Sequence, residues 1–326
     1  MAVSVRSFAK INIGLRIGAA RADGFHELRT VYQTIGLHDV LRVNVVRGSG
    51  IEIRCSTRGV PEDESNTCYR VADRVLRTLR HRAKVTITIE KKLPVQGGLG
   101  GASSNAVATL LALERALKQP LPPEDRMRIA GEVGSDLPLF LLGGMVLGNG
   151  RGEEVYPLED IPGIPCVVAT PQVGVSTPDA FARWDRLQQA DAGRGGKLTV
   201  LPISSTINGF SHSVFAWLSG SSSGVPSRTA GDRAEALLLD LVRAGIENDF
   251  ERVVFPEYPE LRDVKRALER AGAQYASLSG SGSTVYGLFA SPAGAKQAVQ
   301  RLQEYGIRAE VTATLPRREY WRKMFL

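Results

Sequence analysis

Cysteine, aromatic residues and long apolar runs are all scarce in this chain of 326 residues. There are only 3 cysteines, and aromatic residues make up 6% of the composition. Cys55, Cys68 and Cys166 are odd in number, far apart and without a C-x-x-C pair, which argues against a disulfide framework and against a zinc site. We therefore expect the protein to reside in a reducing compartment, the cytoplasm.

Segments suited to a membrane are also scarce. The longest apolar stretch runs from Leu137 to Leu147, about half the length that a membrane-spanning helix needs, and it contains Pro138. No charged and then apolar leader precedes Ser4. We expect no membrane partner.

The chain has a modest excess of positive charge, with 41 Lys and Arg against 34 Asp and Glu and a formal net charge of +7. Such an excess suits nucleic acid, an anionic membrane surface or small anionic ligands. The basic residues are scattered, however, and apart from the segment Arg317–Lys323 no basic stripe is interleaved with aromatic residues. The charge therefore predicts an ordinary solvated surface, and we expect no nucleic-acid partner.

The clearest local pattern is a strand followed by a glycine-rich loop and a helix. Lys84–Glu90 alternates strictly between polar and apolar residues, which predicts a strand. Pro94 and the glycines after it end that strand. Ser103 or Ser104 is placed to cap a helix that keeps apolar spacing to Leu117.

The segment Pro94–Asn105 has the composition of a phosphate-binding loop. Glycines let the backbone approach an anion closely, and the N–H groups and dipole of the following helix attract negative charge. The segment lacks both G-x-x-x-x-G-K-[ST] and G-x-G-x-x-G, so it is neither a Walker loop nor the dinucleotide fingerprint. Glycine-rich turns also arise for packing alone, and glycine density does not separate the two readings.

Composition and turn signals divide the chain into two predicted domains of mixed α and β structure, residues 1–158 and 159–326. The first opens with an alternating strand, Val3–Leu15, that carries polar residues within it. The second contains a long insertion, residues 186–232, that is rich in Gly and Ser. It also carries a second loop of glycines and hydroxyl residues, Ser279–Thr284, which a flexible turn explains equally well.

Four segments together resemble the motifs of the GHMP kinase superfamily, in the same order along the chain. The segments are FAKINIGL (Phe8–Leu15), PVQGGLGGASSNA (Pro94–Ala106), GSDLPLFLLGG (Gly134–Gly144) and SLSGSGSTVYGLF (Ser277–Phe289). The resemblance implies an α+β fold with two domains. An N-terminal domain like the second domain of ribosomal protein S5 would be joined to a C-terminal ferredoxin-like α/β domain, with the active site in the cleft between them.

Within that superfamily the chain most resembles the enzymes that phosphorylate the 2-hydroxyl of 4-diphosphocytidyl-2-C-methyl-D-erythritol in non-mevalonate isoprenoid synthesis. This narrower resemblance lies in RADGFHELRTVYQ (Arg21–Gln33) and ENDFERVVFPEYPEL (Glu247–Leu261). It implies an ATP-dependent kinase of a small cytidine-diphosphate sugar alcohol, with Mg²⁺ carried on the triphosphate and few protein contacts to the metal. The alternatives are another kinase of the superfamily, acting on homoserine, mevalonate or a sugar, and a non-catalytic nucleotide- or RNA-binding protein.

The resemblance also implies the catalytic pair. Asp136 matches the catalytic base of the family and Lys10 matches its partner lysine. A carboxylate can accept the proton of a hydroxyl, while an ammonium beside it keeps the carboxylate ionised and stabilises charge on the transferred phosphoryl group. Without the resemblance, Asp136 would be interpreted as a turn or helix cap and Lys10 as a surface residue of an edge strand.

The same resemblance implies two groups of binding residues. Phe25 and His26 match the pair that holds the cytosine ring, Phe181 matches a ring on its other face, and Asn12 and Thr177 match contacts of the acceptor. At single positions, buried packing is the commoner role for such aromatic side chains. The residues implied to bind ATP are Pro94, Val95, Gln96, Gly97, Gly98, Leu99, Gly100, Gly101, Ala102, Ser103 and Ser104.

Two residues of that ATP loop depart from the family pattern. Gln96 stands where the family usually has Gly or Ala, and Ala102 stands where it usually has Gly. Ala102 costs little if its backbone φ is negative, as at the start of a helix. Gln96 would either crowd the nucleotide or contribute its amide to binding.

Overall fold

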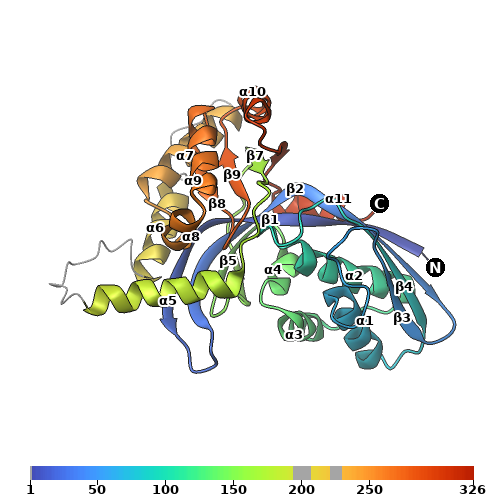
Figure 1. Cartoon of the computed structure of the whole chain (residues 1–326). Coiled ribbons are helices and arrows are strands. Elements are labelled where there is room, and N and C mark those ends of the chain that lie inside the picture. The colour runs from blue at the N-terminus through green and yellow to red at the C-terminus, as the bar shows by residue number, and fades with distance from the viewer. Residues whose placement is uncertain (1, 194–206, 221–229) are drawn as a thin grey trace.

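The computed structural model describes residues 2–193, 207–220 and 230–326. Two long strands, β1 (Ala2–Ala20) and β2 (His26–Val46), run antiparallel through the centre of the molecule (Figure 1). The predicted opening strand is confirmed and continues beyond Leu15. Its register shifts on either side of Lys10 and Asn12, and such bulges re-aim side chains near functional sites.

The first sheet is built around β2, which pairs with β1 along one edge and with two further strands along the other. The strand order is β3-β4-β2-β5-β6. The bounds are β3 (Gly50–Arg54), β4 (Lys84–Glu90), β5 (Met145–Asn149) and β6 (Glu154–Pro157). β3 and β4 are parallel, and α1 (Thr67–Thr78) makes the crossover that such a pair needs. The strand predicted from Lys84–Glu90 is confirmed as β4.

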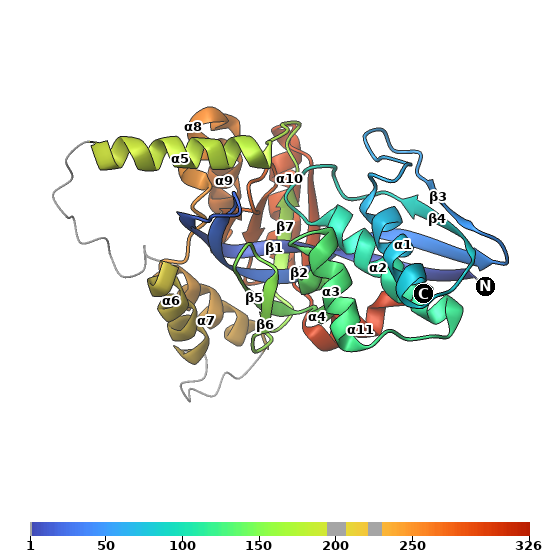
Figure 2. The ribbon, with the colours of Figure 1, turned by 90° about the horizontal axis from the view of Figure 1, so that it is seen from below.

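Four helices lie together with this sheet in Figures 1 and 2, namely α1, α2 (Gly101–Leu117), α3 (Pro123–Val133) and α4 (Leu137–Leu142). Their apolar faces and the sheet share one hydrophobic core. The last helix, α11 (Arg317–Met324), joins the same core through Tyr320. The chain therefore ends against its own beginning, where Leu326 N donates to the Ser4 carbonyl at 3.1 Å.

The start of α2 differs from the prediction that a serine caps it. The helix begins at Gly101, and its N-cap is Gly100, which has a left-handed φ of 68° and offers no side-chain hydrogen bond. The serine cap is therefore wrong, because the glycine loop turns into the helix earlier than the serines. Ser103 and Ser104 both lie inside the first turns of α2.

The second sheet has four antiparallel strands in the order β10-β7-β9-β8. Their bounds are β7 (Pro165–Ala169), β8 (Tyr275–Leu278), β9 (Val285–Leu288) and β10 (Ala309–Ala313). Alternate residues of β7 enter two different cores, so both faces of the sheet are covered. Helices α9 (Pro259–Arg270) and α10 (Pro292–Glu304) pack against it, and α8 (Glu251–Glu257) lies beside α9.

The predicted insertion, residues 186–232, holds more helix than its composition indicated. Helix α5 (Thr177–Gly193) extends into it, and α6 (Ile207–Gly220) lies within it, while α7 (Ala230–Arg243) begins at its end. α6 buries Phe210 and Trp217 in the same hydrophobic core as Cys166 and Val168 of β7. Residues 194–206 and 221–229 lie outside the described part. Among the helices in the described ranges, none is long and apolar enough to cross a membrane.

Candidate active site

Lys10 and Asp136 come together although they are far apart in the sequence. Lys10 and Asn12 lie two residues apart on β1 and so share a face of the strand, while Asp136 lies in the turn that begins α4. Lys10 Nζ is 3.6 Å from Asp136 Oδ2 and donates a hydrogen bond of 2.6 Å to Asn12 Oδ1. Asn12 Nδ2 in turn donates to Thr30 Oγ1 at 2.8 Å. A buried polar chain therefore fixes the ammonium beside the carboxylate.

The two charged groups differ in exposure. The Lys10 side chain is 4% exposed and that of Asp136 is 33% exposed. Burial lowers the pKa of the Lys10 ammonium from its ordinary 10.5, and the Asp136 carboxylate opposes part of that effect. The arrangement is thus a buried cation behind a carboxylate that solvent, or a substrate hydroxyl, can reach.

Tyr32 is a site residue that sequence reasoning missed. Its hydroxyl donates to Asp136 Oδ1 at 3.1 Å, and its ring centroid lies 5.6 Å from Lys10 Nζ. A Cβ at Gly148 would lie 2.5 Å from its ring, and a Cβ at Gly152 would lie 2.4 Å from its hydroxyl, so two glycines make its space. Burial raises the pKa of the phenol well above 10.0, so it stays a donor. In the sequence this tyrosine is indistinguishable from a core residue of a strand.

The predicted ATP loop meets both β1 and the second glycine loop. Lys10 N donates to the Leu99 carbonyl at 3.0 Å, which ties the loop to β1. Ser279 Oγ donates to the Gly98 carbonyl at 3.0 Å, and Thr284 N donates to the Gly97 carbonyl at 3.2 Å. The two glycine loops, one from each half of the chain, are therefore joined directly.

Two glycines of these loops have a left-handed φ, and the close approach of the loops requires the first of them. A Cβ at Gly98, whose φ is +75°, would lie 2.1 Å from the Ser279 carbonyl oxygen. At Gly280 it is the φ of +60° that favours glycine, since a Cβ there would make only an ordinary contact, 3.5 Å from Lys10 Nζ. The glycines thus let the backbones of both loops close around the lysine.

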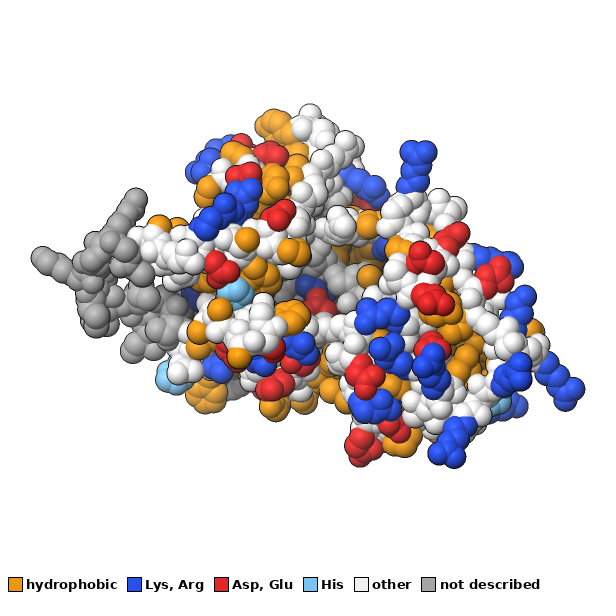
Figure 3. Space-filling model, turned by 60° about the horizontal axis from the view of Figure 1, so that its bottom comes forward, with side chains coloured by type: hydrophobic (Ala, Val, Ile, Leu, Met, Phe, Trp, Pro, Cys, Tyr) orange, Lys and Arg blue, Asp and Glu red, His pale blue; other side chains and the backbone are white. Residues whose placement is uncertain are grey.

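A pocket of about 360 Å³ runs along the ATP loop. It is lined by residues 94–103 of the loop, by Asn105 and Lys91 beside it, and by residues 59–61 and 65–68 on its other side. Figure 3 shows a hollow between the two halves of the molecule, with acidic and basic side chains inside it.

The loop residues that drew attention in the sequence take different positions. Ser104 is buried, and its hydroxyl donates to the Phe8 carbonyl at 2.6 Å, so it holds β1 and is not directed to a ligand. Ser103 lies on the pocket wall. Ala102 is helical and thus free of strain, whereas Gln96 takes a left-handed φ of 60°, which costs about 1 kcal/mol in a residue with a Cβ.

The residues predicted to hold a pyrimidine lie together, though not as two facing phenylalanines. The His26 ring stacks on Phe181 with centroids 4.9 Å apart and an interplanar angle of 10°. Stacked atoms are about 3.5–4 Å apart, so the two rings are offset. His26 Nε2 is 2.7 Å from Asp185 Oδ1, which orients the imidazole. Phe25 is 49% exposed at the tip of the β1–β2 hairpin.

Thr177, the remaining predicted acceptor residue, begins α5 and is bonded to the second glycine loop. Its Oγ1 is 2.7 Å from Ser281 Oγ. The start of α5, the helix that carries Phe181, is therefore attached to the second glycine loop, which in turn contacts the ATP loop. Within the described ranges, no three His, Cys, Asp or Glu side chains cluster as a metal site would.

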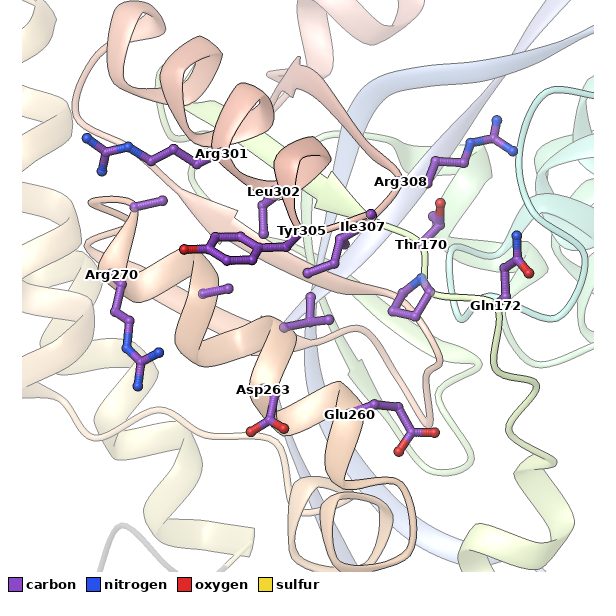
Figure 4. A pocket seen from close by; sticks show the side chains of 15 residues that line it. Thr170, Gln172, Glu260, Asp263, Arg270, Arg301, Leu302, Tyr305, Ile307 and Arg308 are labelled. Carbon is purple, nitrogen blue, oxygen red and sulfur yellow. The ribbon is translucent and has the colours of Figure 1, made fainter.

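A larger hollow, of about 960 Å³, lies away from all these residues between α9, α10 and the segment after β7 (Figure 4). The ring of Tyr305 lies across it, and Arg270 and Arg301 stand at one end. None of the predicted site residues lines it. The volume of a cavity therefore does not identify the candidate site. The site is identified by the place where Lys10 and Asp136 meet the two glycine loops.

Comparisons with known proteins agree with this geometry. The family model described as GHMP kinases N terminal domain matches residues 66–144, and that described as GHMP kinases C terminal matches residues 234–308. The fold and site thus define a small-molecule kinase of the GHMP class, with the predicted α+β fold of two domains.

Relatives over the whole length narrow the class. The chain is 37% identical over 300 residues to a 4-diphosphocytidyl-2-C-methyl-D-erythritol kinase of Solibacter usitatus, covering 92% of this chain and 85% of that protein. It is 34% identical to the kinase of the same name from Desulfitobacterium hafniense, with 97% of each chain covered. The chain belongs to the 4-diphosphocytidyl-2-C-methyl-D-erythritol kinase family.

Solved structures give the same result. The crystal structure of a 4-(cytidine 5'-diphospho)-2C-methyl-D-erythritol kinase superposes with a TM-score of 0.71 at 30% identity, covering 95% of this chain and 98% of that one. A homoserine kinase from Cytophaga hutchinsonii superposes with a TM-score of 0.68 at 20% identity, covering 97% and 95%. The second likeness concerns the fold alone.

Proposed function

We propose that the protein transfers the γ-phosphoryl group of ATP to the 2-hydroxyl of 4-diphosphocytidyl-2-C-methyl-D-erythritol. The observation that carries this proposal is the Asp136 carboxylate, held between the Lys10 ammonium at 3.6 Å and the Tyr32 hydroxyl at 3.1 Å, beside two joined glycine loops. Phosphoryl transfer depends on positioning and electrostatics, and this arrangement supplies both.

Asp136 accepts the proton of the acceptor hydroxyl as its oxygen forms a bond to the γ-phosphorus. The bond between that phosphorus and the bridging oxygen of ADP breaks, and ADP leaves with the electron pair. Lys10, a buried cation that solvent does not screen, stabilises the charge of the transferred group. Tyr32 and Asn12 keep the carboxylate and the ammonium in place.

The triphosphate of ATP lies in this proposal along the residues 94–103 that line the pocket, where the backbone N–H groups at the start of α2 are directed to it. Mg²⁺ bound to the triphosphate would neutralise part of its charge, with few contacts to the protein. Ser103 is the hydroxyl of the loop that faces the pocket, since that of Ser104 is bonded to Phe8.

The acceptor's cytosine lies in this proposal beside His26, on the part of the Phe181 face that the offset imidazole leaves uncovered. Phe25 approaches it from the hairpin tip, and the imidazole, oriented by Asp185, meets its polar edge. The relatives at 37% and 34% identity support this acceptor over homoserine, whose kinase is 20% identical. The three free cysteines support a cytoplasmic location.

The experiment that tests the proposal is coupled release of ADP from ATP and Mg²⁺, with four acceptors in parallel. We expect turnover with 4-diphosphocytidyl-2-C-methyl-D-erythritol and none with homoserine, mevalonate or galactose. Turnover with one of the other three would retain the kinase and overturn the acceptor. Absence of turnover with all four, together with salt-sensitive RNA binding, would favour a binding protein.

A further inference from the structure

The turn between β5 and β6 connects the two parts of the candidate site. Leu28 N, at the start of β2, donates to the Gly150 carbonyl at 2.6 Å. A Cβ at Gly152 would lie 4.0 Å from Asp136 Oδ1. The turn therefore lies between the end of the hairpin that carries Phe25 and the Asp136 carboxylate.

Arg151, in the middle of this turn, is held in a defined orientation. Its Nε donates to Glu153 Oε1 at 2.9 Å, and its backbone N donates to Glu153 Oε2 at 2.6 Å. Its Cζ lies 5.0 Å from the Phe25 ring centroid, a cation–π contact. The side chain is 30% exposed. Within residues 2–193, 207–220 and 230–326, neither terminal guanidinium nitrogen has a hydrogen-bond partner, so two donor groups remain for a ligand.

Other cations near this place are engaged. Lys10 Nζ is bonded to Asn12 and lies beside Asp136. Arg21, on the same hairpin, is paired with Asp23 at 3.2 Å and with Glu27 at 3.0 Å. In the part of the chain that the structure describes, Arg151 is thus a cation between the hairpin tip and Asp136 with donors to spare.

The proposed acceptor has a doubly anionic group at the corresponding place, because its diphosphate joins the cytidine to the methylerythritol. We propose that Arg151 binds this diphosphate and so sets the spacing between the cytidine site and the reacting hydroxyl. The inference rests on the proposed function. A planar guanidinium with two free nitrogens matches phosphate oxygens in a bidentate way, which a lysine does not.

The test compares two ligands that differ only in the diphosphate. Binding of cytidine and of cytidine 5'-diphosphate is measured by calorimetry on the wild-type protein and on Arg151→Gln and Arg151→Lys. We expect Arg151→Gln to weaken binding of the diphosphate by roughly 10- to 100-fold and to leave cytidine binding within about twofold. We expect Arg151→Lys to lose less affinity for the diphosphate than Arg151→Gln does. We also expect Arg151→Lys to raise the KM of the acceptor without changing the KM of ATP.

Arg21→Gln is the matched control, since it removes a neighbouring arginine whose guanidinium is already paired. It is expected to leave the preference for the diphosphate unchanged. If Arg151→Gln weakens cytidine and the diphosphate equally, the arginine acts only through Phe25 and the inference is wrong. Unchanged binding of both ligands overturns it too. If the wild-type protein binds the diphosphate but shows no kinase turnover, the proposed function fails while the subsite stands.

Discussion

The two ends of the candidate site are built in different ways. Around Lys10, the ammonium is bonded to Asn12 and lies 3.6 Å from Asp136, while the backbone N of the same lysine is bonded to the Leu99 carbonyl. At the hairpin tip, Phe25 is 49% exposed, and the imidazole of His26 is oriented by Asp185, which is itself 45% exposed. Transfer of a phosphoryl group requires fixed charges, whereas a flat base requires only an apolar surface and one oriented edge.

The two ends of the candidate site also lie in different parts of the sequence resemblance. The glycine loops and Asp136 lie in the segments that resemble the whole GHMP class, while in our proposal the hairpin and α5 hold the acceptor. We therefore expect substitutions at the first end to reduce kcat or stability, and substitutions at the second end to raise the KM of the acceptor alone.

The largest effect is expected from Asp136→Asn at the first end. The amide keeps the shape of the carboxylate but cannot accept the hydroxyl proton, so kcat falls by about 10²- to 10⁴-fold. ATP binding, measured by equilibrium titration, stays within about twofold, because the residue is outside the set that lines the nucleotide pocket. Unchanged kcat would show that Asp136 is not the base.

Gly98→Ala tests how closely the two loops are joined. Its Cβ would lie 2.1 Å from a backbone oxygen, at a φ of +75°, and we expect a loss of roughly 2–4 kcal/mol in the free energy of unfolding. Gly24→Ala in the hairpin is the matched control, with a φ of +82° and nothing within 4 Å. It costs about 1 kcal/mol, the backbone strain alone. Equal losses in urea unfolding would mean that the loops can separate freely.

Phe181→Ala tests the second end. The ring stacks on His26 and meets Phe250 edge to face at 5.0 Å, so its removal takes away the surface proposed for the base. Stacking of a base is worth about 1–3 kcal/mol, and we expect the KM of the acceptor to rise by roughly 5- to 150-fold. Steady-state kinetics with each substrate varied provides the check, and an equal rise in the KM of ATP would indicate a packing role.

Tyr32→Phe distinguishes a residue that acts through Asp136 from one that packs. Loss of the 3.1 Å bond to Asp136 lowers kcat by about 10-fold, and neither KM changes. Tyr320→Phe is the control, since it removes another buried hydroxyl, bonded at 2.7 Å to the Phe140 carbonyl outside the site. In an Asp136→Asn background, Tyr32→Phe has no further effect on kcat. An additive loss in the double variant would contradict the positioning role.

Much of this fold follows from the sequence because local patterns determine it. The strand Lys84–Glu90 is visible as strict alternation, and the helix that ends at Leu117 is visible as apolar spacing after a glycine-rich loop. The helix α6 in the Gly- and Ser-rich segment is not visible, because the burial of Phe210 against β1 and β2 outweighs composition.

The site follows from the sequence only in part. The composition of the glycine loops indicates a phosphate site without excluding a packing role, whereas the resemblance alone points to Asp136, and nothing in the spacing pairs Asp136 with Lys10. Tyr32 was missed because its role depends on the register that sets it opposite Asn12 across β1 and β2. The bond of Ser104 to Phe8 is equally a tertiary contact, invisible in a row of hydroxyl residues.

The smallest effect concerns pH, and it depends on the buried ammonium of Lys10 at the first end. Burial lowers the pKa of Lys10 from 10.5, so the alkaline limb of kcat/KM, which reports the free enzyme, lies below pH 10.5. Between the folded and unfolded pKa values the unfolded chain binds more protons, so the free energy of unfolding rises with pH in that window. Urea unfolding of wild type against Lys10→Met, from pH 7 to 10, isolates this gain. If the free energies of unfolding of the two proteins changed with pH in parallel, burial would not lower the pKa of Lys10.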